Sequence, residues 1–218
     1  MKITHIIWDW NGTLVNDAVL CVKIVNELLN EYCLSEVNLE YYRNNFRFPV
    51  SSYYEMLGLP CEGTEYEKIA EIFISRYREK AHTCKLQPFA KETLERIFDL
   101  KISQSVLTAG NINDLKKFIS FYGLEKNFSY VDGTSDIYAR GKLELSDFHF
   151  KRLNKKKEEV LLIGDTHHDY EIACRLGIPC ILYTNGHNSS SFLNSLNAEI
   201  ASDLRSVLKG LSVDQRNS

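Results

Sequence analysis

The chain has 218 residues, of which 44% are hydrophobic and 25% are charged, and its formal net charge is −3. This length fits one domain, or one domain with a modest insert, and the apolar fraction is ordinary for a protein with a buried core. The slightly acidic balance, without a basic stripe interleaved with aromatic residues, argues against a nucleic-acid partner.

Cysteine usage and the N-terminus bear on where the protein works. The apolar run before Asp9 is too short for a signal peptide or a membrane span, so we expect a cytoplasmic protein with no membrane partner. The oligomeric state stays open. The cysteines are scattered, without a Cys-x-x-Cys pair or zinc-like spacing, and are expected to be reduced thiols: Cys21, Cys33, Cys61, Cys84, Cys174 and Cys180.

The first half of the chain predicts one strand followed by a long helical stretch. Ile6-Ile7-Trp8 belongs to a short apolar run typical of a buried strand. Apolar residues then recur at helical spacing from residue 20 to residue 83, and we expect no strand between residues 15 and 84. Such an insert is typical of a cap on an α/β core. We therefore predict a core of residues 1–14 and 85–218 and an all-α cap of residues 15–84.

The second half alternates between strands and helices. This alternation predicts a Rossmann-like parallel sheet with helices on both faces, an α/β fold. Strands are expected at 102–107, 128–131, 160–163, 179–183 and 199–201, and helices at 91–100, 113–122, 142–153 and 169–176.

Carboxylates follow two of the predicted strands. Asp9 ends the first strand, and Asp165 comes directly after residues 160–163 and Gly164. Open α/β sheets bind ligands at the carboxyl ends of their parallel strands, so we expect these two side chains to converge. Two acids repel each other unless a cation lies between them, and their hard oxygen ligands suit Mg²⁺.

Four stretches together resemble the haloacid dehalogenase superfamily, specifically its phosphoglycolate-phosphatase-like branch with an inserted helical cap. They are Asp9-Trp10-Asn11-Gly12-Thr13, Thr108 after Ser105-Val106-Leu107, Lys142 after Gly141, and Gly164-Asp165-Thr166-His167-His168-Asp169.

The resemblance implies a Mg²⁺-dependent phosphohydrolase that acts on a small phosphorylated metabolite, with phosphoglycolate-like esters as the nearest analogy. In this family pattern Asp9 is the nucleophile that forms an aspartyl-phosphate. The pattern also implies Asp9, Asp165 and the main-chain carbonyl of Asn11 as Mg²⁺ ligands. Asp169 would ligate through water or orient the other ligands.

The resemblance also implies a site for the phosphoryl group. The hydroxyl of Thr108 and the main-chain N–H groups of Ala109 and Gly110 would hold phosphoryl oxygens, and Gly12 would belong to the substrate-binding loop. Lys142 would neutralise the charge that develops during transfer.

The assignment of Lys142 has competitors in the sequence. Family members often carry proline after this lysine, whereas this chain has Leu143. Arg140 and Lys151 therefore remain alternatives for the cation.

Asn11 is the main departure from the family pattern, because phosphatases of this superfamily usually have a second aspartate there that protonates the leaving oxygen and activates water. An amide cannot transfer a proton at neutral pH, and losing general acid–base help costs about 10²–10⁴ in rate. Three interpretations follow. The substrate has a good leaving group, such as an acyl phosphate or pyrophosphate. Another group substitutes, with His167, His168 or a cap residue favoured over His187. Or the protein binds phosphate compounds with little turnover, as a regulatory protein.

Two further alternatives concern the reaction and its specificity. The aspartyl-phosphate chemistry also fits a phosphomutase, although Asn11 argues mildly against it. Substrate choice is expected to lie with the cap, where Arg43 and Arg47 are surrounded by aromatic residues. We favour Arg47, which precedes Phe48-Pro49 where related caps place a substrate-facing loop, as a ligand for an anionic group on the leaving portion.

Overall fold

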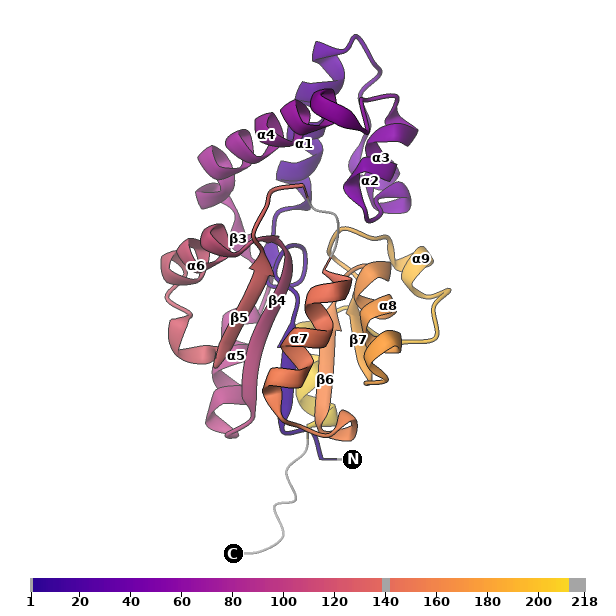
Figure 1. The fold of residues 1–218 in the computed structure, drawn as a ribbon. Helices are drawn as coiled ribbons and strands as arrows, with labels where there is room; N and C mark the ends of the chain where they lie inside the picture. The colour runs from indigo at the N-terminus through magenta and orange to yellow at the C-terminus, as the bar shows by residue number, and fades with distance from the viewer. Residues whose placement is uncertain (1, 139–141, 212–218) are drawn as a thin grey trace, which may run out of the picture.

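A computed structural model of the chain describes residues 2–138 and 142–211. Helices α1 to α4 gather at one end of the molecule, above a sheet flanked by the remaining helices (Figure 1). The described N- and C-terminal ends both lie at the opposite end, below the sheet.

All six strands of the main sheet are parallel, in the order β5-β4-β1-β6-β7-β8. The predicted parallel α/β core is therefore confirmed. Because β1 lies between β4 and β6, the residue that follows it is placed at the centre of the sheet edge. The strands are β1 (His5–Trp8), β4 (Ser103–Asn111), β5 (Tyr130–Thr134), β6 (Val160–Gly164), β7 (Cys180–Tyr183) and β8 (Glu199–Ala201).

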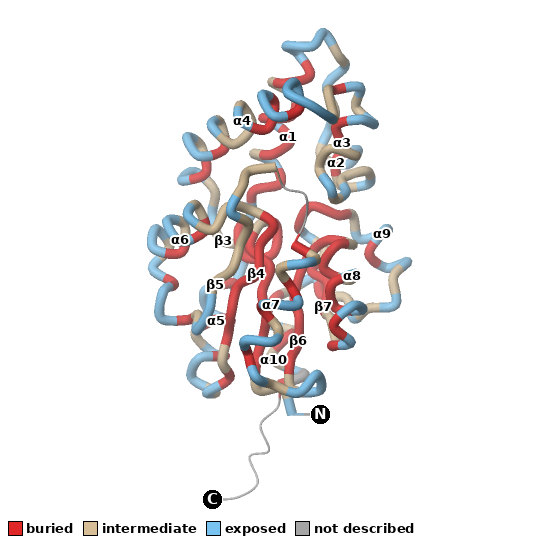
Figure 2. Tube along the Cα trace, viewed as in Figure 1, coloured by how far each residue is buried: buried red, intermediate tan, exposed pale blue. Residues whose placement is uncertain are grey.

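Both faces of this sheet are covered. Along β1, Ile6 and Trp8 pack into one hydrophobic cluster and Ile7 into another, because successive side chains of a strand point to opposite faces. This explains the continuous apolar runs in the sequence, which Figure 2 shows as the buried centre of the molecule. The flanking helices are α5 (Ala90–Asp99), α6 (Ile112–Phe121), α7 (Leu143–Leu153), α8 (His167–Leu176), α9 (Ser190–Leu193) and α10 (Val207–Gly210), with short 3₁₀ turns at Ala81–Thr83, Glu125–Asn127, Lys157–Glu159 and Leu204–Ser206.

The helices at the other end have a hydrophobic cluster of their own, which includes the fully buried Ile24, Leu28, Tyr53 and Ile69. These helices are α1 (Ala18–Glu31), α2 (Leu39–Asn45), α3 (Val50–Leu57) and α4 (Gly63–Lys80). The separate cluster is consistent with a cap, and the division into a core of residues 1–14 and 85–218 and a cap of residues 15–84 stays a prediction.

The expectation of no strand between residues 15 and 84 is wrong at its first two positions. Val15–Asn16 forms β2, which pairs antiparallel with β3 (Lys85–Leu86). A two-residue strand is too short to show an alternating pattern, so the sequence carried no signal for it. This ribbon joins the two places where the chain passes between the sheet and helices α1 to α4.

Some element ends also differ from prediction. β4 continues through Thr108 to Asn111, whose side chain accepts from the N–H groups of Asn113 and Asp114 and so caps α6. The local pairing with β5 is irregular between Leu107 and Asn111. The segment Thr108–Gly110, which is predicted to hold the phosphoryl group, is therefore the end of a strand.

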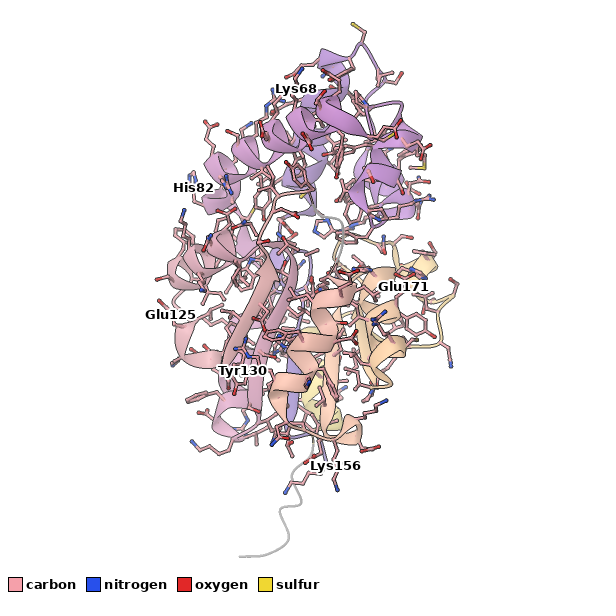
Figure 3. The ribbon with its side chains drawn as sticks, viewed as in Figure 1. Lys68, His82, Glu125, Tyr130, Lys156 and Glu171 are labelled. Carbon is pink, nitrogen blue, oxygen red and sulfur yellow. The ribbon has the colours of Figure 1, made fainter. Side chains whose placement is uncertain are left out.

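Charged side chains such as Lys68, Glu125 and Lys156 lie on the outside of the molecule (Figure 3). All six cysteines are free thiols. Within residues 2–138 and 142–211, no helix combines the length and apolarity needed to cross a bilayer.

Candidate active site

Three carboxylates meet at the carboxyl edge of the sheet. Asp9 directly follows β1, Asp165 directly follows the adjacent β6, and Asp169 lies in the first turn of α8. One oxygen from each lies within 4.8 Å of the others, and all three residues are buried. The predicted convergence of Asp9 and Asp165 is therefore a feature of the structure.

Glycines permit this close approach. Gly12 has a φ of +78°, and a Cβ there would lie 2.2 Å from Asp165 Oδ2. A Cβ on Gly164 would lie 2.2 Å from Asp169 Cγ. A residue with a Cβ could not occupy either position unless the neighbouring carboxylate moved, so both positions favour glycine for steric reasons. The Gly12 N–H itself donates to Asp17 Oδ1 and to the Val15 carbonyl.

The oxygens of Asp165 are held by two donors. The Thr13 hydroxyl donates to Oδ1 at 2.6 Å, and the His187 main-chain N–H donates to Oδ2 at 2.6 Å. Such bonds fix the direction of the carboxylate before any ligand arrives.

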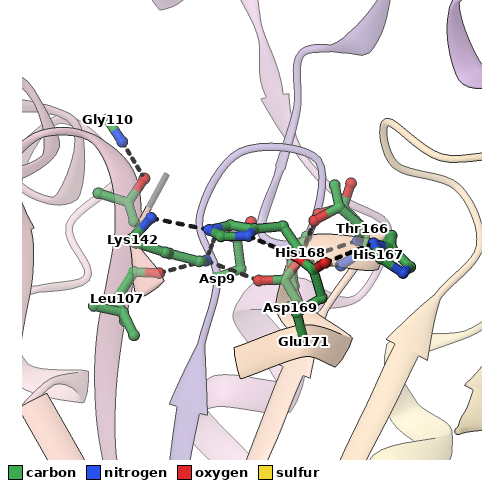
Figure 4. A network of polar contacts seen from close by, with 12 residues as sticks. Asp9, Leu107, Gly110, Lys142, Thr166, His167, His168, Asp169 and Glu171 are labelled. Carbon is green, nitrogen blue, oxygen red and sulfur yellow. Dashed lines mark hydrogen bonds and ion pairs between the residues drawn. The ribbon is translucent and has the colours of Figure 1, made fainter. Parts of the chain in front are cut away.

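Lys142 lies between Asp9 and Asp169. Its ammonium pairs with Asp9 Oδ1, lies 2.8 Å from Asp169 Oδ1 and donates to the Leu107 carbonyl at 2.7 Å (Figure 4). Asp169 Oδ2 accepts from the Thr166 hydroxyl and main-chain N–H, which turns its other oxygen toward the lysine. Lys142 is therefore a buried cation in direct contact with the predicted nucleophile.

The electrostatics of these groups follow from burial and mutual contact. Burial raises the pKa of Asp9, with Asp169 and Asp165 adding to the effect and Lys142 opposing it. Burial raises the pKa of Asp165 to about 6. Burial alone would also raise the pKa of Asp169, but Lys142 outweighs it and lowers that pKa. The excess of buried acid over base favours a bound cation.

The donor set fits Mg²⁺. Three carboxylates offer hard oxygen ligands at one point, and Asp169 Oδ1 is buried with an ion pair but without a hydrogen bond. Asp9, Asp165 and Asp169 would hold the ion. The role of the Asn11 carbonyl as a further ligand stays a prediction.

The predicted phosphate-binding residues border a cavity together with Asp9 and Lys142. Thr108, Ala109 and Gly110 all line it. Thr108 Oγ1 accepts from the Gly110 N–H at 3.0 Å, so the hydroxyl keeps its own hydrogen for another acceptor.

Two residues were alternatives to Lys142 as the positively charged group of the site. Lys151 is exposed in the last turn of α7, and Arg140 lies outside the described residues. The structure thus brings Lys142 to Asp9, the predicted nucleophile, and leaves Lys151 exposed on α7.

The side chain of Asn11 is held by hydrogen bonds to Asp17 and Tyr77. Its amide nitrogen donates to Asp17 Oδ2 at 2.6 Å and to the Tyr77 hydroxyl at 2.8 Å. Its side-chain oxygen lies on the Gly110 side, 3.7 Å from where a Cβ on that glycine would stand. Asn11 therefore presents a hydrogen-bond acceptor toward the predicted phosphate site.

Asp17 and His187 are site residues that sequence reasoning missed or undervalued. His187 Nε2 lies 3.2 Å from Asp17 Oδ1, and its Nδ1 shares a hydrogen bond with the Tyr42 hydroxyl. Burial would lower the pKa of His187, but Asp17 outweighs it and raises that pKa to about 9. The available signal was weak: an acid beside a helix start, and a histidine in the loop after β7 at the same sheet edge.

The other two histidines lie elsewhere. His168 Nε2 accepts from the Lys142 main-chain N–H at 2.9 Å, and its Nδ1 lies 3.2 Å from Glu171 Oε2. His167 is partly exposed and stacks on Phe192. His187 lines the cavity, whereas His167 and His168 are not among its described lining residues. Because His168 accepts a hydrogen bond from the Lys142 main chain, it helps to position that lysine.

Arg43 and Arg47, in the predicted cap, are also not among the described residues that line the cavity. Arg43 donates to the Asn185 and Gly186 carbonyls and so fastens α2 to the loop after β7. Arg47 is exposed, donates to the Asn45 carbonyl and is not among the described lining residues. The structure does not bring Arg47 together with the other predicted site residues.

The buried His187–Asp17 pair predicts a pH-dependent stability. The folded pKa of His187, about 9, exceeds its ordinary 6.5, so the stabilisation is complete below pH 6.5 and is lost as pH rises through 9. The expected loss is on the order of 3 kcal/mol, or roughly 6–12 °C in Tm. Thermal melts of metal-free protein from pH 6 to pH 10 should show this decline, and His187→Gln should flatten it. His167→Gln, at a partly exposed site, should melt like the wild type at every pH; a decline that His187→Gln preserves would contradict the assignment.

Comparisons with known proteins agree with this geometry. The chain is 23% identical to a phosphoglycolate phosphatase from Rhodobacter capsulatus over 85% of this chain and 86% of that protein. It is 21% identical to the pyrophosphatase PpaX from Oceanobacillus iheyensis over 95% of this chain and 96% of that protein. Its fold matches a haloacid dehalogenase-like family hydrolase from Streptococcus pneumoniae with a TM-score of 0.81 at 20% identity, over 96% of this chain and 99% of the other.

The family comparison matches residues 6–183 to the haloacid dehalogenase-like hydrolases. The matched span runs from β1 to β7 and includes every carboxylate of the site. The resemblance predicted from the sequence is therefore confirmed, and the chain belongs to the haloacid dehalogenase-like hydrolase family.

Proposed function

We propose that the protein is a Mg²⁺-dependent phosphohydrolase that acts on a small phosphorylated metabolite through an aspartyl-phosphate on Asp9. The observation that carries the proposal is the position of Asp9. It follows the central strand, pairs with the buried Lys142 and lies beside Asp165 and Asp169. The relatives named as phosphoglycolate phosphatase and pyrophosphatase support the same phosphoryl chemistry.

The reaction uses the residues as they are arranged. A carboxylate oxygen of Asp9 bonds to phosphorus while the bond from phosphorus to the leaving oxygen breaks, and the leaving oxygen keeps the electron pair and takes a proton from solvent. Water then attacks phosphorus and the bond from phosphorus to Asp9 breaks, which releases phosphate and a proton and restores the carboxylate. Lys142 neutralises negative charge next to Asp9, and Thr108 donates its hydroxyl hydrogen to a phosphoryl oxygen. When bound, Mg²⁺ would neutralise part of the charge on the carboxylates and the phosphoryl group.

The first test is phosphate release from phosphoglycolate, pyrophosphate, acetyl phosphate and phenyl phosphate, with Mg²⁺ and with EDTA. We expect Mg²⁺-dependent release, and rapid acid quenching should trap a phosphoryl group on the peptide that contains Asp9. Tight calorimetric binding of these compounds without release would instead favour the phosphate-binding regulatory protein. A phosphoryl group found on any other residue would refute the nucleophile assignment.

A further inference from the structure

The cavity beside Asp9 carries information on the substrate. Resting on the proposed function, we propose that the leaving portion of the substrate is an uncharged apolar group of about the size of one aromatic ring. This differs from the carboxylate of phosphoglycolate and the phosphate of pyrophosphate, the compounds for which the relatives are named.

The cavity has the size and lining for such a group. Its volume is about 160 Å³, and it extends from Asp9 to the cap helices. Engineered cavities of about 150 Å³ lined by Leu, Ile and Phe bind benzene, so a cavity of this size, which also borders Asp9, Thr108 and Gly110, has room for a leaving portion no larger than about one ring. Apolar side chains that are only half-buried form much of its wall: Phe46, Phe48, Val50, Phe73, Ile74 and Phe118.

Several polar atoms of the wall are already engaged by protein partners. The Tyr42 hydroxyl bonds to His187 Nδ1, and the Tyr77 hydroxyl donates to Asp17 Oδ2 at 2.7 Å. Asp114, at the α6 side, pairs with Arg78 at 2.7 Å. Tyr42 and Tyr77 therefore offer a ligand their ring faces rather than free hydroxyl groups.

The charges of the wall disfavour an anionic leaving portion. Two of the described lining residues are basic, and both are already paired with acids. Lys142 pairs with Asp9 and Asp169, and His187 pairs with Asp17. A carboxylate in the cavity would lose its hydration against aromatic rings, and it would find, among the described lining residues, no basic side chain that is not already paired with an acid. An apolar group incurs neither cost and gains from burial.

The decisive comparison is benzyl phosphate against phosphoglycolate. The two esters carry a ring or a carboxylate on the same methylene and share an alkoxide-type leaving oxygen. We expect kcat/KM with Mg²⁺ to be about 10- to 100-fold higher for benzyl phosphate, the effect of burying one ring. Equal values, or a higher value for phosphoglycolate, would overturn the proposed specificity and leave the phosphohydrolase intact.

A binding measurement separates specificity from turnover. Benzylphosphonate and phosphonoacetate cannot be hydrolysed, and they differ only by the ring or carboxylate on the same methylene. With Mg²⁺ present, benzylphosphonate should bind at least about 10-fold more tightly by calorimetry. If benzylphosphonate binds more tightly but no ester is hydrolysed, the apolar specificity stands and the proposed phosphohydrolase function is rejected. No preference would reject the specificity.

A cap variant should reverse the selection. Ile74 of α4 lines the cavity and is half-buried. Ile74→Arg places a cation there, and should lower kcat/KM for benzyl phosphate about 10-fold while raising it for phosphoglycolate. The matched control is Ser75→Arg, which adds the same charge at the exposed neighbouring position and should leave both values near wild type. Thermal melts establish that each variant is folded, and an unchanged ratio in folded Ile74→Arg would count against the proposal.

Discussion

Asp9→Asn is expected to lower kcat/KM for every substrate by about 10⁴-fold or more, as removal of a nucleophile does in other enzymes. The amide has no negative oxygen to attack phosphorus, so the covalent intermediate does not form. Its carbonyl oxygen can still accept a hydrogen bond from Lys142, whose ammonium faces this position. The variant should therefore fold, and the loss should fall on the chemistry. Phosphate release at saturating Mg²⁺, together with acid-quench mass spectrometry of the Asp9 peptide, measures both effects.

The matched control for this variant is Asp147→Asn. Asp147 carries the same chemical change on the surface, where it pairs with Arg175. We expect its kcat/KM to stay within about twofold of wild type, since surface ion pairs contribute little. If Asp9→Asn kept more than a tenth of the wild-type rate, Asp9 would not be the nucleophile.

The sheet and its carboxylates could be predicted because each leaves a local signal. Ile6-Ile7-Trp8 and residues 160–163 are apolar runs buried on both faces, and each is followed closely by an acid that a core strand would not otherwise carry. The topology rules for parallel sheets then bring Asp9 and Asp165 to one edge. Strand pairing confirms this inference from sequence.

The missed features depend on contacts between distant parts of the chain. Asp17 directly precedes α1, yet its carboxylate contacts His187, 170 positions away. Arg47 looks suited to an anionic substrate among aromatic residues, but folding turns it outward and leaves aromatic side chains such as Phe46 facing the cavity. The local sequence does not show which side chains of the segment between α2 and α3 point toward the cavity.

The second large effect concerns the amide that stands where this family usually has an acid. Asn11→Asp is expected to raise kcat/KM for benzyl phosphate by about 10²–10⁴, the usual contribution of a general acid–base. Phenyl phosphate should gain far less, because its leaving oxygen needs little protonation. The Asn11 amide nitrogen lies 2.6 Å from Asp17 Oδ2, so the new carboxyl would share a proton with Asp17, and its raised pKa would keep it an acid near neutral pH.

The sharpest control removes the shared proton. In the double variant Asn11→Asp with Asp17→Asn, the neighbour donates a hydrogen bond to the new carboxylate and lowers its pKa, so the gain should fall at neutral pH and reappear at lower pH. The wild-type preparation is checked by peptide mass, because Asn-Gly sequences deamidate and would create the variant unintentionally. If Asn11→Asp gave no gain on benzyl phosphate while wild type already hydrolysed it efficiently, a second group would already supply the proton. His187, which lines the cavity beside Asp17, would then be the first residue to replace.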